Sequence, residues 1–335
     1  MATRVRERGE MTAPRIVVLL SAPNMIPALD RYRPFFERAG IDVLVAHVRE
    51  RLSEEELLRY AGKIDGAICG DDCFTPPVLR AFAPRLRVIS KWGTGIDSID
   101  REEASRLGIP ICNTPDAFTD PVADSVIGYV LAFARRGPWQ DRAMKAGRWE
   151  KPPCRALREC SVGVIGVGRI GKAVLRRAKV FGPRLLGNDI VEIDRQFLEE
   201  LRIEMVGLRD LLANSDFISL NCDLNPTSRR LINRETLGWV RQGAVLINTA
   251  RGPVVEEEAL IEALHTGLLS GAALDVFEDE PPPSDSPLRA MENVLLAPHN
   301  ANNSPSAWER VHRNTVRNLL RGLGLEVPQE LAQDK

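Results

Sequence analysis

The sequence has almost no net charge and no long apolar run. Its 45 Lys and Arg residues nearly balance 46 Asp and Glu residues, which leaves a formal net charge of −1. This balance excludes a protein that holds nucleic acid through bulk positive charge. A hydrophobic content of 44% excludes a strongly acidic disordered chain. Since no stretch approaches about 18 uninterrupted apolar residues, we expect no transmembrane helix.

The six cysteines also lack a metal-binding pattern. None belongs to a CxxC pair, and Cys69 and Cys73 have no cluster of histidines nearby to complete a zinc site. The apolar run at 16–20 is too short for a signal-peptide core. We therefore expect no metal, reduced and mostly buried thiols, and a cytoplasmic location.

Short apolar runs alternate with helical patterns along most of the 335 residues, a length that suggests two domains. The first block has predicted strands at 15–20, 41–46, 66–69, 87–90 and 109–112, with helices at 26–39, 53–61, 76–82 and 100–107. After a long predicted helix at 120–134, strands recur at 161–165, 185–188, 216–220, 244–248, 271–276 and 294–297, and a last helix follows near 306–320. This alternation predicts an α/β fold with doubly wound parallel sheets.

The clearest motif is a glycine-rich turn in the segment SVGVIGVGRIGKAV. It carries Gly166, Gly168 and Gly171 in the pattern GxGxxG, between an apolar strand and a helix predicted at 169–180. Gly166 permits a tight turn, Gly168 lets the backbone approach a pyrophosphate, and Gly171 lets the helix pack on the strand. The helix N-terminus would supply N–H groups and positive dipole to the phosphates.

An acidic residue follows at the distance that dinucleotide binding requires. Asp189 lies 18 residues after Gly171, at the end of the next predicted strand. A carboxylate there accepts hydrogen bonds from the ribose hydroxyls and repels a 2′-phosphate, which favours NAD over NADP. The alternative is a glycine-rich turn followed by an unrelated surface aspartate.

Three polar residues follow other strands of the second block. Arg251 follows the strand at 244–248, Glu280 lies in the loop after 271–276, and His299 follows 294–297. Arginine can bind a carboxylate, histidine can exchange a proton near neutral pH, and a glutamate beside it would favour its charged form. Together they suit reduction of a 2-keto acid. Alternatively, each has a structural role, or Glu280 belongs to a solvated acidic turn.

No function is expected for the other three histidines. His265 ends a predicted helix, where positive charge suits the helix dipole. His47 and His312 have no visible partners in the sequence.

Six sequence motifs follow one another along the chain: KWGTGIDSID, NTPDAFTDPVADS, GVIGVGRIG, NTARGPVV, AALDVFEDEP and APHNA. From about residue 16 to residue 323, the chain resembles the D-isomer-specific 2-hydroxyacid dehydrogenases of the phosphoglycerate dehydrogenase and glyoxylate/hydroxypyruvate reductase group. The resemblance implies a Rossmann NAD-binding domain (115–300) inserted in a flavodoxin-like substrate domain (12–114 and 301–325). It also implies a homodimer built around the helix at 120–134.

The resemblance further implies roles for individual residues. Arg251 would bind the substrate carboxylate and carbonyl, His299 would be the acid/base paired with Glu280, and Asp275 would hold the nicotinamide amide. A glycine loop would offer backbone N–H groups to the substrate carboxylate, and its residues are Lys91, Trp92, Gly93, Thr94 and Gly95. The expected cofactor site adds Arg169, Ile170 and Thr249 to the three glycines and Asp189.

The chain departs from the family pattern at several positions. Phosphoglycerate dehydrogenases often carry an arginine near the end of the third strand, where this chain has Asp71 and Asp72. Two acids there would repel a substrate phosphate. Asp124 stands where these enzymes usually have Glu, and Asn221 stands where His is common.

Two other functions on the same fold remain open at this point. One is an NAD-sensing interaction protein similar to C-terminal-binding corepressors, which would need an exposed apolar groove in the first domain. The other is formate or phosphite oxidation, but formate enzymes typically pair the histidine with Gln, whereas this chain offers Glu280.

Overall fold

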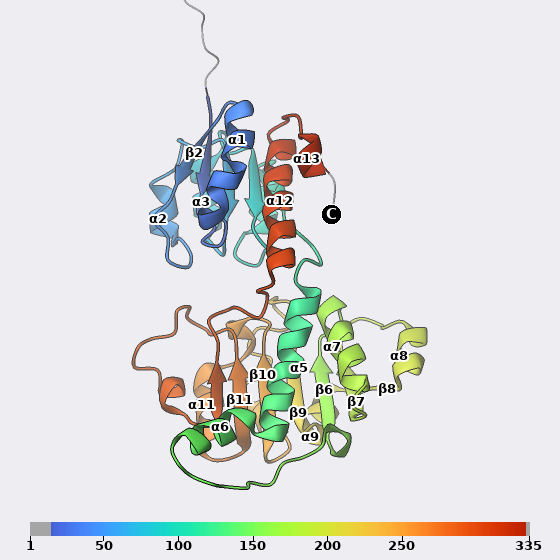
Figure 1. Cartoon of the computed structure of the whole chain (residues 1–335). Helices are drawn as coiled ribbons and strands as arrows, with labels where there is room; N and C mark the ends of the chain where they lie inside the picture. The colour runs from blue at the N-terminus through green and yellow to red at the C-terminus, as the bar shows by residue number, and fades with distance from the viewer. Residues whose placement is uncertain (1–14, 333–335) are drawn as a thin grey trace, which may run out of the picture. The chain divides into compact units, whose positions relative to one another are not determined.

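The computed structural model describes residues 15–332, which form two compact α/β units (Figure 1). The terminal unit comprises 15–115 together with 309–332, and the central unit comprises 116–308. Within this described part of the chain, no helix is both long enough and apolar enough to cross a membrane.

The terminal unit is built on a five-stranded parallel sheet of order β2-β1-β3-β4-β5. The strands are β1 (Ile16–Leu20), β2 (Ile41–Val45), β3 (Gly66–Cys69), β4 (Val88–Lys91) and β5 (Ile111–Cys112). This is the flavodoxin-like order, and it reverses direction at β1. The loops that follow β1 and β3 therefore flank the point where such sheets bind ligands.

Both ends of the chain contribute helices to this unit. They are α1 (Leu29–Arg38), α2 (Glu54–Leu58), α3 (Pro76–Phe82), α4 (Arg101–Arg106), α12 (Pro305–Gly322) and α13 (Gln329–Ala332). The α12 helix packs directly on β4, since Ser90 Oγ donates to the Thr315 carbonyl at 2.8 Å. A Cβ on Gly322 would lie only 2.3 Å from a methyl of Val88, so the backbones approach closely here.

The central unit is built on a seven-stranded parallel sheet of order β12-β11-β10-β9-β6-β7-β8. Its strands are β6 (Ser161–Ile165), β7 (Arg184–Asn188), β8 (Ile203–Met205), β9 (Phe217–Leu220), β10 (Ala244–Asn248), β11 (Leu269–Leu274) and β12 (Val294–Leu296). Its helices are α5 (Thr119–Arg135), α6 (Gly137–Lys145), α7 (Arg169–Lys179), α8 (Arg195–Leu201), α9 (Leu208–Asn214), α10 (Arg234–Leu237) and α11 (Glu257–His265). The strand order reverses at β6, as in a Rossmann domain.

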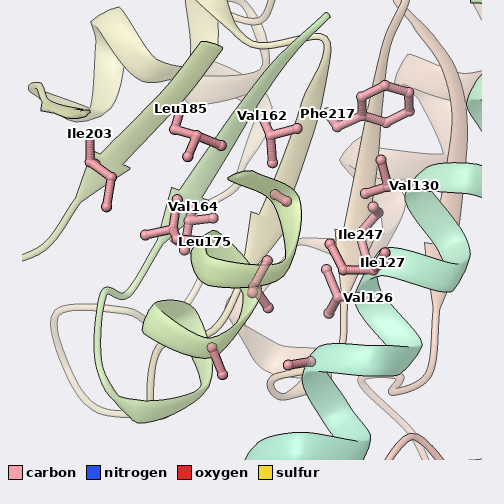
Figure 2. Packing of buried hydrophobic residues seen from close by; sticks show 14 of the residues in the cluster. Val126, Ile127, Val130, Val162, Val164, Leu175, Leu185, Ile203, Phe217 and Ile247 are labelled. Carbon is pink, nitrogen blue, oxygen red and sulfur yellow. The ribbon is translucent and has the colours of Figure 1, made fainter. Parts of the chain in front are cut away.

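Helices α5 and α7 cover one face of this sheet. Figure 2 shows Val126 and Val130 of α5 and Leu175 of α7 packed with strand residues such as Val162 and Ile247. The same two helices are joined at the surface by Arg177, whose guanidinium pairs with Asp124 at 2.6 Å and with Asp120 at 2.8 Å. Asp124, which departs from the family pattern, thus has a structural partner.

The predicted fold class, two parallel-sheet α/β domains, is confirmed. Several elements of the central unit were not predicted, among them β8, α6, α8, α9 and α10. β8 has only three residues at the edge of the sheet, too few for a hydrophobic period, and α6 follows α5 after a single residue. The predicted helix at 26–39 is in fact a short 3-10 turn followed by α1.

Candidate functional site

The glycine-rich turn joins β6 to α7 in the central unit. Gly166 has a φ of +88°, and a Cβ there would lie 2.6 Å from the backbone nitrogen of Cys222. A Cβ on Gly171 would lie 2.0 Å from the Gly166 carbonyl oxygen, whereas around Gly168 there is open space. The first and third glycines are therefore required by the fold, and Gly168 leaves room for a ligand at the start of α7.

Asp189 follows β7 and is fixed beside this turn. Its Oδ2 accepts the Val167 N–H at 2.6 Å, and its Oδ1 accepts the Val191 N–H at 3.1 Å. The carboxylate is thus oriented by backbone groups on both sides, at the position that dinucleotide-binding domains use for the ribose hydroxyls.

Two buried polar atoms at the same edge of the sheet lack partners. Asn221 Oδ1, after β9, and Thr249 Oγ1, after β10, have no hydrogen-bond partner among the described residues. Buried polar atoms are normally satisfied. A polar ligand at this edge would satisfy them, so the residues present fit a dinucleotide.

Arg169 and Ile170, also predicted for the cofactor site, lie at the start of α7, and their side chains have other partners. The Arg169 guanidinium pairs with Asp116 at 2.6 Å, and the Ile170 side chain packs against the core. Their backbone groups form the first turn of α7, where unpaired N–H groups lie.

Arg251 sits in a tight turn after β10. The Asn248 amide accepts from the Ala250 N–H at 3.0 Å and donates to the Arg251 carbonyl at 3.0 Å. A Cβ on the next residue, Gly252, would lie 1.8 Å from the carbonyl oxygen of Phe277. The turn that carries Arg251 is thus pressed against the loop that carries Glu280. Sequence reasoning missed Gly252, although a glycine directly after the arginine was visible.

Glu280 and His299 form a direct pair. Glu280 Oε2 lies 2.9 Å from His299 Nδ1, and Glu280 Oε1 accepts the Phe277 N–H at 3.0 Å. A carboxylate is acceptor-only, so Nδ1 carries the proton in this pair. Nε2 is the ring nitrogen that can exchange a proton with a substrate.

His299 has a φ of +49°, and Asp275 stabilises this unusual turn. The Asp275 carbonyl accepts the His299 N–H at 2.7 Å, and its carboxylate accepts the N–H groups of Asn300 and Ala301 at 2.8 and 2.9 Å. Burial raises the pKa of Asp275, although these backbone bonds oppose the shift. Ser125 of α5 also donates to the Ala301 carbonyl at 3.2 Å. Asp275 therefore organises the histidine turn, a contribution that the sequence did not indicate.

The three residues come from adjacent strands. β10, β11 and β12 are parallel neighbours, with Asn248 opposite Leu274 and Leu274 opposite Leu296. The turn of Arg251, the loop of Glu280 and the turn of His299 thus begin at one edge of the sheet. The glycine-rich turn after β6 begins at the same edge.

The terminal unit holds the loop 91–95. Lys91 ends β4, is only 4% exposed, and its Nζ lies 3.0 Å from Asp71 Oδ1. Gly93 has a φ of +127°, its carbonyl accepts the Thr114 N–H at 2.8 Å, and Thr94 Oγ1 donates to the Thr114 carbonyl. These two hydrogen bonds to Thr114 fix the loop at Gly93 and Thr94.

Asp71 and Asp72 have different environments, which corrects the expectation that both would face a substrate phosphate. Asp72 is fully buried, where it accepts from Ser21 Oγ at 2.5 Å and from the Leu52 N–H at 2.6 Å. Burial raises the pKa of Asp72. Asp72 therefore joins the loops after β1, β2 and β3, and Asp71 is paired with Lys91.

Comparison with known proteins places this geometry in a family. Residues 127–301 match the model of the D-isomer specific 2-hydroxyacid dehydrogenase, NAD binding domain. A glyoxylate reductase of Thermofilum pendens is 40% identical over 289 residues, which cover 83% of this chain and 84% of that protein. This chain belongs to the D-isomer-specific 2-hydroxyacid dehydrogenase family. It is accordingly an enzyme of the dehydrogenase and reductase type, and its cofactor is NAD.

Other relatives in the family carry different names. A D-3-phosphoglycerate dehydrogenase of Methanocaldococcus jannaschii is 35% identical over 277 residues, 81% of this chain but 52% of that protein. The crystal structure of a D-lactate dehydrogenase from Aquifex aeolicus with NAD and lactic acid has a TM-score of 0.77 at 28% identity. That alignment covers 90% of this chain and 93% of the other.

Proposed function

We propose that this dehydrogenase interconverts a D-2-hydroxy acid and its 2-keto acid with NAD(H), on a glyoxylate/hydroxypyruvate-like or 3-phosphoglycerate-like substrate. The observation that carries the proposal is the Glu280–His299 pair at the sheet edge that also presents Arg251. In this proposal, residues 115–300 bind NAD, and residues 12–114 with 301–325 bind the substrate. Of these, residues 12–14 lie outside the described part of the chain.

The chemistry follows from the side chains. When bound, NADH supplies a hydride to the carbonyl carbon. Arg251 binds the substrate carboxylate and polarises the carbonyl, since its guanidinium can donate two parallel hydrogen bonds. His299 donates a proton from Nε2 to the carbonyl oxygen, so one hydride and one proton convert the ketone to an alcohol. Glu280 orients the ring and stabilises its charged form.

The loop 91–95 of the terminal unit is a further proposed substrate-binding segment. Its backbone N–H groups would bind the substrate carboxylate, as glycines allow close approach. Within the central unit, Gly166, Gly168, Gly171, Asp189 and Thr249 would hold the cofactor, with Asp275 at the nicotinamide amide. Names of relatives support the substrate class, since one from Thermotoga maritima at 33% identity is a hydroxypyruvate reductase.

We also propose a cytoplasmic homodimer assembled around α5 and its flanks. The segment after α6 carries an exposed apolar residue, Trp149, at 77%, and Met144 of α6 is 51% exposed. Exposed apolar side chains of this size favour an interface with a second copy. All six cysteines are free, which fits a reducing compartment, but only Cys69 and Cys160 are buried, so the expectation of mostly buried thiols was wrong.

The test is NADH oxidation with glyoxylate, hydroxypyruvate, 3-phosphohydroxypyruvate and pyruvate. We expect His299→Ala to lower kcat by about 10²–10⁴-fold, the usual contribution of a positioned acid/base. His265→Ala, at the exposed end of α11, is the matched control and should turn over normally. Full turnover by His299→Ala would contradict the proposal, and tight NADH binding without any turnover would favour the interaction-protein alternative.

A further inference from the structure

His312, for which the sequence indicated no partners, is buried in the terminal unit. It lies on α12 with only 4% of its surface exposed. Its Nε2 is 2.9 Å from the backbone carbonyl of Asn24, in the turn that follows β1. A carbonyl only accepts, so Nε2 carries a proton and donates it to this bond.

The imidazole ring also contacts aromatic side chains of two other elements. Its centroid lies 5.7 Å from that of Trp92, which follows β4, and 6.1 Å from that of Tyr32 on α1. These distances are within the range of attractive ring pairs. One side chain of α12 therefore joins the turn after β1, helix α1 and the first loop residue after β4.

Trp92 is the second residue of the loop 91–95 and is buried. The residue is 5% exposed, and its backbone N–H donates to the Cys69 carbonyl at 2.9 Å. The next residue, Gly93, turns the chain at a φ of +127°. The positions of the N–H groups in this loop thus depend on where the Trp92 ring is held.

We propose that His312 is a positioning residue that fixes Trp92, and through it the loop 91–95, in the arrangement that binds the substrate carboxylate. The proposal rests on the function proposed above for this loop. His312 acts on the loop through Trp92, so its loss should weaken binding of the keto acid and leave hydride transfer unchanged.

The surroundings of His312 make this support dependent on pH. Glu309 lies one turn earlier on α12, where it accepts from the Tyr32 hydroxyl at 3.0 Å and pairs with Arg31 at 2.8 Å. Lys91 is the charged group next to Trp92, and it pairs with Asp71. Burial, followed by the nearby Arg31 charge, holds the pKa of His312 below its usual value, against the opposing effects of the Asn24 bond and Glu309.

The protonation state of His312 decides how well its ring fits this site. At neutral pH the ring is uncharged and packs between Trp92 and Tyr32. In acid it gains a proton, and a charged ring is costly in this buried site. We therefore expect the KM for the keto acid to rise in acid through His312.

The experiment compares His312→Leu and His312→Gln with wild type in steady-state NADH oxidation. Leu cannot donate to Asn24, so the KM for the keto acid should rise about tenfold, while kcat and the KM for NADH stay within about twofold. Gln keeps an N–H donor but cannot titrate, so at about pH 8 its KM should be near that of wild type. As the pH falls from about 8 into acid, the KM of wild type should rise, and the KM of His312→Gln should rise less.

His265→Gln is the matched control, since it changes an exposed histidine at the end of α11. Equal losses in kcat and KM, or an unchanged KM in His312→Leu, would overturn the proposal. If His312→Leu does not fold, a His312→Gln enzyme with the same acid rise in KM as wild type would overturn it. No turnover of any keto acid by wild type would instead overturn the proposed function, and this inference with it.

Discussion

His299 Nδ1 lies 2.9 Å from Glu280 Oε2, and the second oxygen of that carboxylate accepts the Phe277 N–H. The glutamate is therefore held by its own loop while it orients the imidazole. Both oxygens of Glu280 act as acceptors, whereas an amide offers one acceptor oxygen and one donor group and carries no charge.

Glu280→Gln should expose the contribution of charge. The variant can keep its oxygen on the Phe277 N–H, but its NH2 group then faces His299 Nδ1 and no longer stabilises a protonated ring. We expect kcat for reduction to fall about tenfold or more, and reduction to fail at a lower pH than in wild type. The measurement is a pH profile of kcat/KM, with Glu278→Gln as the control. A profile that stays in place would show that the charge of Glu280 does not act on His299.

Gly252→Ala should disturb the site through packing. Its Cβ would meet the Phe277 carbonyl at 1.8 Å, so the turn of Arg251 and the loop of Glu280 would be forced apart. We expect a loss of about 3 kcal/mol in the free energy of unfolding and about 100-fold in kcat/KM.

Gly128→Ala is the matched control for that substitution. A Cβ at this position of α5 meets nothing within 4 Å, so the change should be neutral or stabilise by up to about 1 kcal/mol. Denaturant unfolding and steady-state kinetics measure both variants. Normal kinetics in Gly252→Ala would contradict the coupling between the two loops.

Asp189→Ala should weaken discrimination between the two nicotinamide cofactors. The variant removes the negative charge beside the glycine-rich turn, so we expect the ratio of NADH to NADPH affinity to fall at least tenfold. Fluorescence titration with each cofactor measures this ratio. Asp194→Ala removes the cap of α8 and should cost stability while leaving the ratio unchanged. If the ratio of NADH to NADPH affinity is unchanged in Asp189→Ala, Asp189 does not bind the ribose of the cofactor.

Asp216 should make the central unit sensitive to acid. Burial alone would raise its pKa, but bonds from Arg155 at 2.8 Å and from Ser161 outweigh this, and the net pKa is lowered. The stabilisation is therefore complete above the unfolded pKa of about 3.9 and is lost as pH falls through the lower folded value.

Asp216→Asn tests this pH dependence. We expect the variant to be less stable by about 2 kcal/mol at neutral pH, with a difference that shrinks below about pH 4. Thermal unfolding as a function of pH measures it. The exposed pair of Asp141 with Lys145 gives the control Asp141→Asn, which should change stability by less than about 0.5 kcal/mol. If the stability difference between Asp216→Asn and wild type is the same at every pH, the lowered pKa of Asp216 is contradicted.

Much of this molecule could be predicted from the order of its residues. The strands β6 and β10 match their predicted ranges because each is a continuous buried run, and the helix α5 matches closely because its apolar residues recur at helical spacing. Arg251, Glu280 and His299 were predicted because parallel strands end at one edge, so residues distant in sequence meet there.

Other features depended on contacts that no local pattern reveals. The burial of Asp72 became visible only with Ser21 and Leu52 around it. His312 acquires its partners from three elements far away in sequence. The anchoring of the His299 turn by Asp275 likewise needs the three-dimensional path of the chain.

The packing of α12 on β4 has a consequence for synthesis on the ribosome. The central unit is one continuous stretch, so all of its strands are available once residue 308 has emerged. The sheet of the terminal unit is made first but lacks the helix that contributes Thr315, Leu319 and Gly322 to its covered face. The part of the chain that is translated earliest thus completes its core last, after the inserted domain has had time to fold.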